Sequence, residues 1–361
     1  IDLKTRLVKM RAAVDARVET VFDHGRYILG PEVVELETVL ANYVGVKHCV
    51  GVSSGTDSLL MALMALKIGP EDEVITVPYT WISTAEVIAL VGASPVFVDI
   101  EDSTWNMDPN LLEGAITERT KAIMPVGIYG QTADMNAINT IAAAHNLPVI
   151  EDAAQSFGAT YHGKKSFALS LIGSTSFFPS KPLGGFGDGG ALFTDEDDLA
   201  ETFRQIRVHG QASKHHHPIV GLNGRLDTLQ AAMLLAAFEL FPDEVKQRRY
   251  IADCYNTLLT EANIEGVQLP QVLEGSTSVY AQYTLLSSDR DALQARLKKA
   301  GIPSVAYYAK PLHLQPVFEH LGHKLGDFPV TESVADQCLS LPMSAYLTEA
   351  QQGQVVTAIL A

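Results

Sequence analysis

The sequence predicts an α/β protein with a mostly parallel central sheet and a smaller C-terminal α+β domain. Strand-like and helix-like segments alternate from His48 onward, which is typical of a parallel sheet covered by helices on both faces. The 361 residues exceed the size at which a single core keeps growing, so a second domain is expected. Hydrophobic residues make up 47% of the chain, which is enough to fill both cores.

Apolar periodicity and turn residues define the elements expected in the first half of the chain. Apolar residues at helical spacing predict an amphipathic helix over residues 1–26. Strands are expected at residues 48–52, 73–77, 95–100, 122–129 and 148–152, and helices from Thr56 and at residues 109–116 and 133–146. Another helix is expected to open with a capping box formed by Ser83 and Glu86.

The second half is expected to contain two long helices followed by the smaller domain. One helix is predicted from Leu226 to Phe241, and a connecting helix is predicted to start at Pro242 and end near Asn263. A strand from Ser278 and a helix over residues 291–300 follow. The predicted organisation is therefore an N-terminal helical segment (1–26), a large domain (27–242), and a connecting helix with a small C-terminal domain (243–361).

The composition restricts the possible partners and compartments. The chain has 26 Lys and Arg against 42 Asp and Glu, a formal net charge of −16, which argues against a nucleic-acid surface. An anionic substrate would then need a local basic pocket. Cys49, Cys254 and Cys338 show no metal or redox spacing, so a reducing cytoplasm is the simplest interpretation. No apolar run approaches the length of a membrane span, and no signal peptide is recognised.

A lysine stands between two apolar runs in the stretch from Ser174 to Thr194. Lys181 follows a β-branched and aromatic run that ends at Pro179, and five glycines lie between Gly184 and Gly190. Burying an unpaired ammonium costs several kcal/mol, so the lysine either reaches solvent or is held in a site. It is either an ordinary loop lysine or an imine-forming lysine with a lowered pKa. A dinucleotide-binding loop fits poorly, because no strand-then-helix frame surrounds these glycines.

An acidic residue and a helix start complete the pattern. Asp152 stands where the apolar run from Pro148 should end as a parallel strand, and ligands bind at such strand ends. A lysine that forms an imine and an aspartate that keeps the pyridine nitrogen protonated are the groups that a pyridoxal phosphate site requires. Gly55 and Thr56 precede an apolar helix whose first N–H groups suit a phosphate. The alternatives are a loop cap for Asp152 and an ordinary helix cap at residues 53–57.

Together these motifs resemble the DegT/DnrJ/EryC1/StrS family of pyridoxal-phosphate sugar aminotransferases. They are Ser-Gly-Thr-Asp at 54–57, Glu-Asp-Ala-Ala-Gln at 151–155, Ser-Phe-Phe-Pro-Ser-Lys-Pro-Leu-Gly at 176–184 and Gly-Asp-Gly-Gly at 187–190. The resemblance runs from Tyr27 to the motif that begins at Pro311. It implies the aspartate aminotransferase fold (fold type I), pyridoxal 5'-phosphate as cofactor, and a large domain that binds it. Within the family the chain is most similar to enzymes that aminate sugar carbon 3, in particular the UDP-2-acetamido-2-deoxy-3-oxo-glucuronate aminotransferases.

The resemblance assigns cofactor roles to matching residues. Lys181 and Asp152 would be catalytic; Trp81 would stack on the ring, and Gln155 would lie near the ring hydroxyl. Ser176, Gly55 and Thr56 would bind the phosphate. Trp81 could otherwise be a core residue, the commoner role for a large aromatic. Ser176 and Lys181 are an odd number of residues apart, so they share a side only if the chain bends at Pro179.

Further matches concern the partner subunit and the substrate. Asn223 would reach the cofactor phosphate of the partner subunit, which implies a homodimer with shared active sites. Arg225 would lie in the substrate pocket, where its fork suits a carboxylate, although it could instead cap the following helix. Tyr307, Tyr308 and His313 would lie on the substrate-facing loop.

The roles of Tyr307 and of residues 129–131 stay open, whereas a metal site at residues 215–217 is not expected. The closest relatives usually carry His where this chain has Tyr307, which places a neutral phenol near the expected sugar acid. Tyr129, Gly130 and Gln131 close an expected strand as ordinary loop groups or as part of the site. The three histidines at 215–217 are not expected to bind a metal, because consecutive residues cannot easily all face one ion.

The implied reaction moves an amino group from L-glutamate, which leaves as 2-oxoglutarate, to carbon 3 of a nucleotide-linked keto sugar in surface polysaccharide (lipopolysaccharide O-antigen) biosynthesis. Family members that dehydrate the sugar instead carry His at the lysine position, so Lys181 favours amine transfer. The alternatives are amination at carbon 4, a dTDP-3-keto-6-deoxyhexose substrate, and a non-catalytic regulator built on the same fold.

Overall fold

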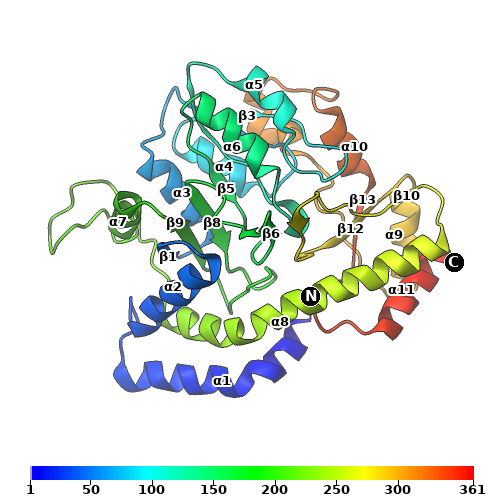
Figure 1. Ribbon diagram of the computed structural model, residues 1–361, viewed down its shortest axis with the longest axis horizontal. Helices are drawn as coiled ribbons and strands as arrows, with labels where there is room; N and C mark the ends of the chain where they lie inside the picture. Colours follow the sequence, from blue (N-terminus) through cyan, green and yellow to red (C-terminus); the bar gives the residue numbers. More distant parts are fainter. Residues whose placement is uncertain (1) are drawn as a thin grey trace.

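The computed structural model describes residues 2–361, and a seven-stranded sheet forms the centre of its large domain (Figure 1). The strand order is β1 (His48–Val52), β9 (Gly190–Thr194), β8 (Ile172–Ser176), β5 (Ile150–Asp152), β4 (Thr120–Ile123), β2 (Glu73–Thr76) and β3 (Ser94–Phe97). Parallel bridges from Ile123 to Val149 and from Val126 to Asp152 join the β5 and β4 halves. Only β9 runs antiparallel to its neighbours within this sheet of the described chain, so the predicted mostly parallel sheet is confirmed.

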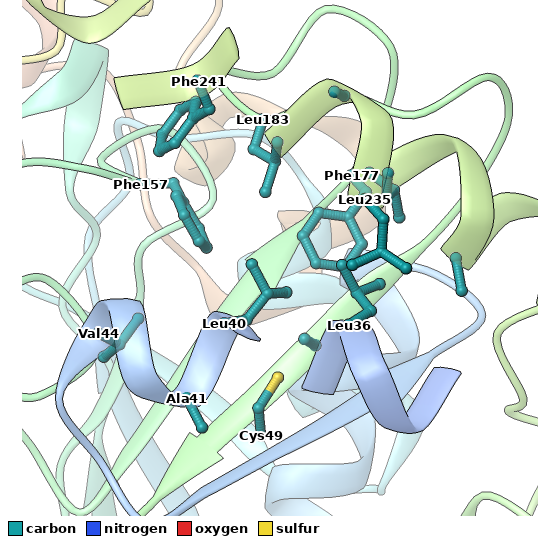
Figure 2. Close-up of a cluster of buried hydrophobic side chains, with 14 of the residues drawn as sticks. Leu36, Leu40, Ala41, Val44, Cys49, Phe157, Phe177, Leu183, Leu235 and Phe241 are labelled. Carbon is teal, nitrogen blue, oxygen red and sulfur yellow. The ribbon is translucent and has the colours of Figure 1, made fainter. Parts of the chain in front are cut away.

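Alternating side chains of the strands pack against helices on the two faces. On one face Cys49 lies among residues of α1 (Leu3–His24), α2 (Pro31–Val44) and α8 (Thr228–Ala262). Figure 2 shows Leu36 and Leu40 of α2 pointing into this cluster. Its neighbour Val50 faces the opposite side, with residues of α3 (Gly55–Ala65), α4 (Ser83–Leu90) and α7 (Asp197–Ile206). This is the period of two expected of a strand that is buried on both faces.

Helix α8 is one continuous helix of 35 residues, so the break predicted at Pro242 is wrong. Phe241 and Val245 pack in the core of the large domain, and Ile251 and Tyr255 pack in the C-terminal core. A proline inside a helix costs about 3 kcal/mol. Burial on both sides of the proline outweighs that cost, which local sequence rules do not include. The helix is about 52 Å long and runs along the base of both domains (Figure 1).

Helix α1 connects this long helix to the loop that carries Lys181. The Arg6 guanidinium pairs with Glu244 of α8 (Nε to Oε1, 3.0 Å) and also donates to the carbonyl of Gly184 at 3.0 Å. Tyr346, from the C-terminal domain, donates its hydroxyl to the same carboxylate. The predicted N-terminal helix is therefore present, and it contacts the large domain, the long helix and the lysine loop together.

The C-terminal domain is a small antiparallel sheet with helices, as expected for an α+β unit. Its sheet contains β10 (Val267–Gln268), β12 (Tyr283–Ser287) and β13 (Cys338–Leu341), and its helices are α9 (Arg290–Lys299) and α11 (Glu349–Leu360). Between α9 and β13 the chain returns to the large domain through 3-10 turns at Leu312–Leu314 and Pro316–Leu321 and through α10 (Pro329–Gln337). No helix within residues 2–361 combines the length and apolar character needed to cross a membrane.

Shorter elements show where local prediction was inexact. The strand expected at 122–129 ends at Ile123, and residues Ile128–Gly130 form a 3-10 turn; the helix expected at 109–116 is a 3-10 turn (Pro109–Leu111) followed by α5 (Leu112–Ala115). The remaining elements are α6 (Met135–Ala144), β6 (Thr160–Tyr161), β7 (Lys164–Lys165) and β11 (Ser276–Thr277). The strand expected from Ser278 starts at Tyr283. The capping box is wrong: Ser83 lies inside α4, and its hydroxyl contacts Thr56 instead.

Candidate functional site

The carboxylate of Asp152 is held at the end of β5, in the middle of the sheet. It is 7% exposed. The hydroxyl of Thr84 donates to its Oδ2 at 2.8 Å, and the N–H of Ala154 lies 3.4 Å from its Oδ1. Burial raises the pKa of Asp152, whereas the bond from Thr84 and the charge of Lys181 lower it. The carboxylate is therefore oriented and only partly satisfied, which suits a protonated ring nitrogen as a further partner.

Lys181 follows β8 on a tight turn and shares this site with Asp152. Its backbone N–H donates to the carbonyl of Phe178 at 2.8 Å, and the N–H of Phe178 donates to the hydroxyl of Ser176 at 3.2 Å. The chain therefore turns back directly after the strand, as the predicted bend requires. Burial lowers the pKa of Lys181, and the charge of Asp152 raises it. A lysine with a lowered pKa is the form in which the amine acts as nucleophile or base.

A close backbone approach lies beside this turn, at the start of α3. A Cβ placed on Gly55 would lie 2.5 Å from the Cβ of Ser176, so only glycine fits there. Ser54 caps the helix by accepting from the N–H of Asp57 at 3.0 Å. The hydroxyl of Thr56 lies 2.9 Å from that of Ser83. Helix N–H groups and several hydroxyls thus meet at one point, the arrangement that binds a phosphate.

Trp81 forms one wall of the site and is not a core residue. Its side chain is 57% exposed, unlike that of an interior tryptophan. Its ring centroid lies 6.2 Å from that of Tyr308 with the planes tilted by 44°. Its backbone oxygen lies 3.2 Å from the hydroxyl of Thr84, the same hydroxyl that contacts the carboxylate of Asp152. The exposed ring face suits stacking on a planar ligand.

Gln155 connects Asp152's loop to the loop after α9. It is 3% exposed and accepts at Oε1 from the N–H of Tyr129 at 3.0 Å. Its Nε2 lies 3.4 Å from the hydroxyl of Tyr308. Burial is the main cause that raises the pKa of Tyr308, followed by the charge of Asp152, so the phenol stays neutral. The structure thus brings Trp81, Gln155 and Tyr308 together above Asp152.

Arg225 and Asn223 lie on the strand-like segment before α8. Arg225 forms an antiparallel bridge with Val52, and α8 starts only at Thr228 with Asp227 at its N-cap, so Arg225 does not cap this helix. The Nε of Arg225 is buried and has no hydrogen-bond partner among residues 2–361. A buried guanidinium donor without a partner suits an anionic ligand. Asn223 is exposed on the surface of this chain.

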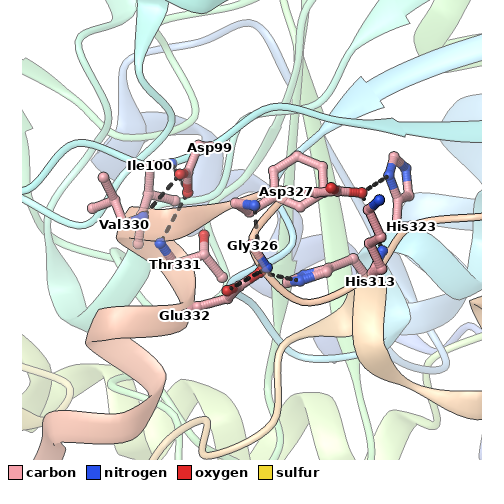
Figure 3. Close-up of polar contacts among 11 residues, drawn as sticks. Asp99, Ile100, His313, His323, Gly326, Asp327, Val330, Thr331 and Glu332 are labelled. Carbon is pink, nitrogen blue, oxygen red and sulfur yellow. Dashed lines mark hydrogen bonds and ion pairs between the residues drawn. The ribbon is translucent and has the colours of Figure 1, made fainter.

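His313 does not join the other predicted site residues. Its ring is 2% exposed, packs on Phe328 with centroids 4.7 Å apart, and pairs through Nε2 with Glu332 at 3.0 Å. Figure 3 shows this pair beside Gly326, whose N–H donates to the same carboxylate at 2.8 and 2.9 Å. Burial lowers the pKa of His313, and Glu332 raises it. We therefore assign His313 to holding its own loop rather than to substrate contact. Tyr307 is 37% exposed at the surface.

Sequence reasoning missed Thr84 and Tyr79. Thr84 orients Asp152, and Tyr79 donates its hydroxyl to the carbonyl of Tyr307 at 2.8 Å. A signal for Thr84 existed, because hydroxyl residues gather at 80–84 directly after a strand end. Tyr79 gave no such signal, since a tyrosine after a strand is more often a core residue.

Pyridoxal phosphate fits these residues. The close approach of Gly55 to Ser176 sets the first turn of α3 beside the Ser176 hydroxyl, and helix N–H groups with hydroxyls suit a phosphate. Asp152 and Lys181 provide the acid and the amine, and Trp81 offers an exposed ring face. Residues 2–361 contain no group of three or more His, Cys, Asp or Glu that could hold a metal ion.

Known proteins resemble this chain over nearly its whole length. The model of the DegT/DnrJ/EryC1/StrS aminotransferase family matches residues 8–360. The chain is 51% identical to the UDP-2-acetamido-2-deoxy-3-oxo-D-glucuronate aminotransferase of Pseudomonas aeruginosa, over 97% of this chain and 96% of that protein. It is 46% identical to a pleiotropic regulatory protein of Geobacillus stearothermophilus, over 99% of this chain and 96% of that protein.

Solved structures share the whole fold. A DegT DnrJ EryC1 StrS aminotransferase from Brucella abortus superposes with a TM-score of 0.96 at 43% identity, over 100% of this chain and 98% of that one. NtdA from Bacillus subtilis, solved with bound cofactor PMP, superposes with a TM-score of 0.90 at 31% identity, over 98% of this chain and 81% of that one.

Proposed function

Because the chain belongs to the DegT/DnrJ/EryC1/StrS aminotransferase family, we propose that it transfers the amino group of L-glutamate to carbon 3 of a nucleotide-linked keto sugar. It is a pyridoxal-phosphate-dependent aminotransferase of fold type I. The substrate we favour is UDP-2-acetamido-2-deoxy-3-oxo-glucuronate. The observation that carries this choice is the 51% identity to an aminotransferase of that name, together with the buried Nε of Arg225, which has no hydrogen-bond partner among residues 2–361.

The proposed chemistry divides among a few side chains. Bound pyridoxal phosphate supplies an electron sink that takes up an amino group and passes it on. Lys181 holds the cofactor and, once its amine is free, moves a proton at Nζ; its lowered pKa favours the neutral amine that this step needs. Asp152, oriented by Thr84, would hold a proton on the pyridine nitrogen of the bound cofactor. Ser176 and the first turn of α3 would hold its phosphate, and the exposed ring of Trp81 would stack on it.

Arg225 is proposed to recognise the carboxylate of the substrate. A guanidinium offers two parallel donors to a carboxylate, and the Nε of Arg225 has no other partner in the described chain. The carboxylate of a uronate sugar and those of glutamate are both possible partners. We propose that Tyr308 and Gln155, whose side chains lie 3.4 Å apart, contact the sugar.

The family resemblance implies that Tyr307 replaces a histidine, and we propose that this replacement changes which sugars the enzyme accepts. Its phenol is neutral and cannot offer the positive charge that an imidazolium would give to a sugar acid. The proposed recognition of the acid therefore depends on Arg225.

The active unit we propose is a homodimer with shared sites, located in the cytoplasm. Asn223 is exposed on its own chain, as a residue that reaches a partner subunit must be. Cys49, Cys254 and Cys338 are all free thiols, which supports a reducing compartment.

A non-catalytic regulator is the second candidate, because a relative of 46% identity is named a pleiotropic regulatory protein. The retained Lys181 and its partner Asp152 favour catalysis. Purified protein that is yellow and bleaches with L-glutamate would support the enzyme. A colourless protein that does not respond to cofactor and glutamate would favour the regulator.

One assay distinguishes the sugars. Enzyme bleached with L-glutamate is freed of the donor and offered UDP- and dTDP-linked 3-keto and 4-keto sugars in turn, with and without a carboxylate at carbon 6. We expect the colour to return fastest with the UDP-linked 3-keto uronate. Faster return with a 4-keto sugar would overturn the carbon 3 assignment, and equal rates with and without the carboxylate would overturn recognition of the acid.

A further inference from the structure

The tripeptide of Tyr129, Gly130 and Gln131 joins the large domain to segments that lead into the C-terminal domain. The carbonyl of Gly130 accepts from the N–H of Val279 at 2.8 Å. The side chain of Gln131 donates to the carbonyl of Gln271 at 2.7 Å and accepts from the N–H of residue 273 at 3.0 Å. The carbonyl of Tyr129 also lies 3.4 Å from the N–H of Gln282, so each residue binds a different stretch. We call residues 129–131 the interdomain joint.

Tyr129 has a strained backbone, with a φ of 57°. Gly130 follows with a φ of 124°, which glycine adopts without strain. A Cβ on Gly130 would lie 2.6 Å from the backbone nitrogen of Tyr280, so the two domains approach each other more closely than a side chain allows. A bulky residue in the left-handed region persists only when its surroundings fix it, and such residues gather at functional sites.

The side chain of Tyr129 reaches the loop that faces the site. Its hydroxyl lies 2.6 Å from that of Tyr79, and both phenols donate toward the carbonyl oxygen of Tyr307, Tyr79 at 2.8 Å. Its ring packs edge-on against Trp105 with centroids 5.7 Å apart. Burial is the main cause that raises the pKa of both Tyr79 and Tyr129 well above the usual range, so both remain donors.

This loop is also held at its two ends, and Ala306 and Tyr308 within it pack against the core of the large domain. At its start Val305 exchanges backbone hydrogen bonds of 2.8 and 3.2 Å with Ser340 of β13. Beyond its end the N–H of Leu312 donates to the carbonyl of Pro78 at 2.8 Å. Three of the six residues between these two points, at 307, 309 and 310, are exposed. The carbonyl of Tyr307 is one point at which the large domain holds the middle of this loop.

Tyr129 also contacts Gln155, the side-chain partner of Tyr308. Its N–H donates to Oε1 of Gln155 at 3.0 Å, and Nε2 of Gln155 lies 3.4 Å from the hydroxyl of Tyr308. One residue thus fixes the backbone before Tyr308 through its hydroxyl and the side-chain partner of Tyr308 through its N–H.

We propose that Tyr129 is a positioning residue that sets Tyr308 against Gln155 and so governs the binding of the keto-sugar acceptor. This inference rests on the proposed function. The donor half-reaction takes place at Lys181 and Asp152 with a small amino acid, whereas a nucleotide sugar is large enough to extend to the loop at 305–310. Loss of the positioning contact therefore weakens the acceptor half-reaction selectively, because binding energy from remote parts of a substrate is lost.

The test compares Tyr129→Phe with Tyr255→Phe in the cofactor-loaded protein. The first removes one of the two hydroxyls that donate toward the Tyr307 carbonyl and leaves that of Tyr79 in place. The second removes a similarly buried hydroxyl that donates to the carbonyl of Pro342 at 3.0 Å inside the C-terminal core. We expect Tyr129→Phe to speed hydrogen–deuterium exchange at residues 305–310 about five-fold and to raise KM for the UDP-linked 3-keto sugar about five-fold, the effect of one net hydrogen bond. Bleaching by L-glutamate should change less than about two-fold.

Three results would overturn the proposal. They are unchanged exchange at 305–310 in Tyr129→Phe, the same change in Tyr255→Phe, and equal losses in the two half-reactions. If wild-type protein aminates no sugar of the panel, the proposed function fails, but the exchange experiment still decides whether Tyr129 holds the loop.

Discussion

Thr84 of α4 and Asp152 of β5 are 68 positions apart in the chain and share a hydrogen bond of 2.8 Å. This bond orients a carboxylate that is 7% exposed and lowers a pKa that burial otherwise raises. The same hydroxyl lies 3.2 Å from the backbone oxygen of Trp81. The acid of the site and its aromatic wall are therefore positioned by one threonine.

Replacing Thr84 by Val should weaken cofactor binding. The substitution keeps the shape but removes the donor to Oδ2 of Asp152, so the pKa of this carboxyl rises and its ionised form becomes rarer. A hydrogen bond to a charged group contributes about 1.5–3 kcal/mol, which predicts a dissociation constant for pyridoxal phosphate at least about ten-fold higher, measured by fluorescence titration. Thr84→Ser keeps the hydroxyl and should stay near wild type. Equal affinities of the Val and Ser variants for pyridoxal phosphate would contradict a role of the Thr84–Asp152 hydrogen bond in cofactor binding.

Gly55→Ala should also weaken cofactor binding, for a steric reason. The added Cβ would lie 2.5 Å from the Cβ of Ser176, so the first turn of α3 must move away from β8. Gly114→Ala is the matched control, because a Cβ there meets no atom within 4 Å. We expect about ten-fold weaker binding of the cofactor in the first variant and no change in the second, measured by equilibrium dialysis. Unchanged binding in Gly55→Ala would place the phosphate elsewhere.

Activity should return when two inactive chains are mixed. Lys181→Ala removes the amine that holds the cofactor, and we expect it to lose transamination and the yellow colour. Asn223→Ala removes the proposed contact to the partner subunit. If sites are shared, a mixed dimer contains one site with both residues intact, so unfolding and refolding the two variants together restores up to about a quarter of wild-type activity. No recovery, with mixed dimers demonstrated by mass spectrometry, would exclude shared sites.

Folding stability should fall as the pH rises from about 4.5 to 7, because of Glu151. Burial raises the pKa of Glu151 from 4.5 to about 7, although the hydroxyl of Ser166 and the N–H of Phe167 oppose this. The folded state binds the proton more tightly than the unfolded state. Between pH 4.5 and about 7, Glu151 therefore lowers the free energy of unfolding by about 3 kcal/mol. Urea unfolding of Glu151→Gln at pH 5 and pH 8 should show a smaller decrease than wild type. Parallel pH profiles would mean that Glu151 stays ionised.

The alternation of strand-like and helix-like segments was sufficient to predict the sheet and its covering helices. The strand ends were less predictable. Tyr129, for example, lies in a 3-10 turn and not in a strand, and its N–H binds a distant side chain, a contact that no local pattern encodes. Pro242 misled for the same reason: its penalty is local, whereas the packing of Phe241 and Val245 comes from distant parts of the chain.

The motif residues of the site could be predicted, and their supports could not. Asp152 and Lys181 carry recognisable chemistry in a recognisable place. Thr84 and Tyr79 act only through contacts across the fold. His313 shows the converse, since a histidine on a substrate-facing loop has an obvious possible role, but its ring is covered and paired with Glu332.

The unbroken course of α8 also limits how the two domains can move. Two domains joined by one continuous helix cannot rotate freely relative to each other. Opening of the enzyme therefore has to bend α8 or displace loops at its surface. Pro242 removes one rung of the helix ladder, which makes it the natural place for such a bend. Because Glu244 is bound there by Arg6, a bend at this place would pull on α1 and, through Gly184, on the turn that presents the amine.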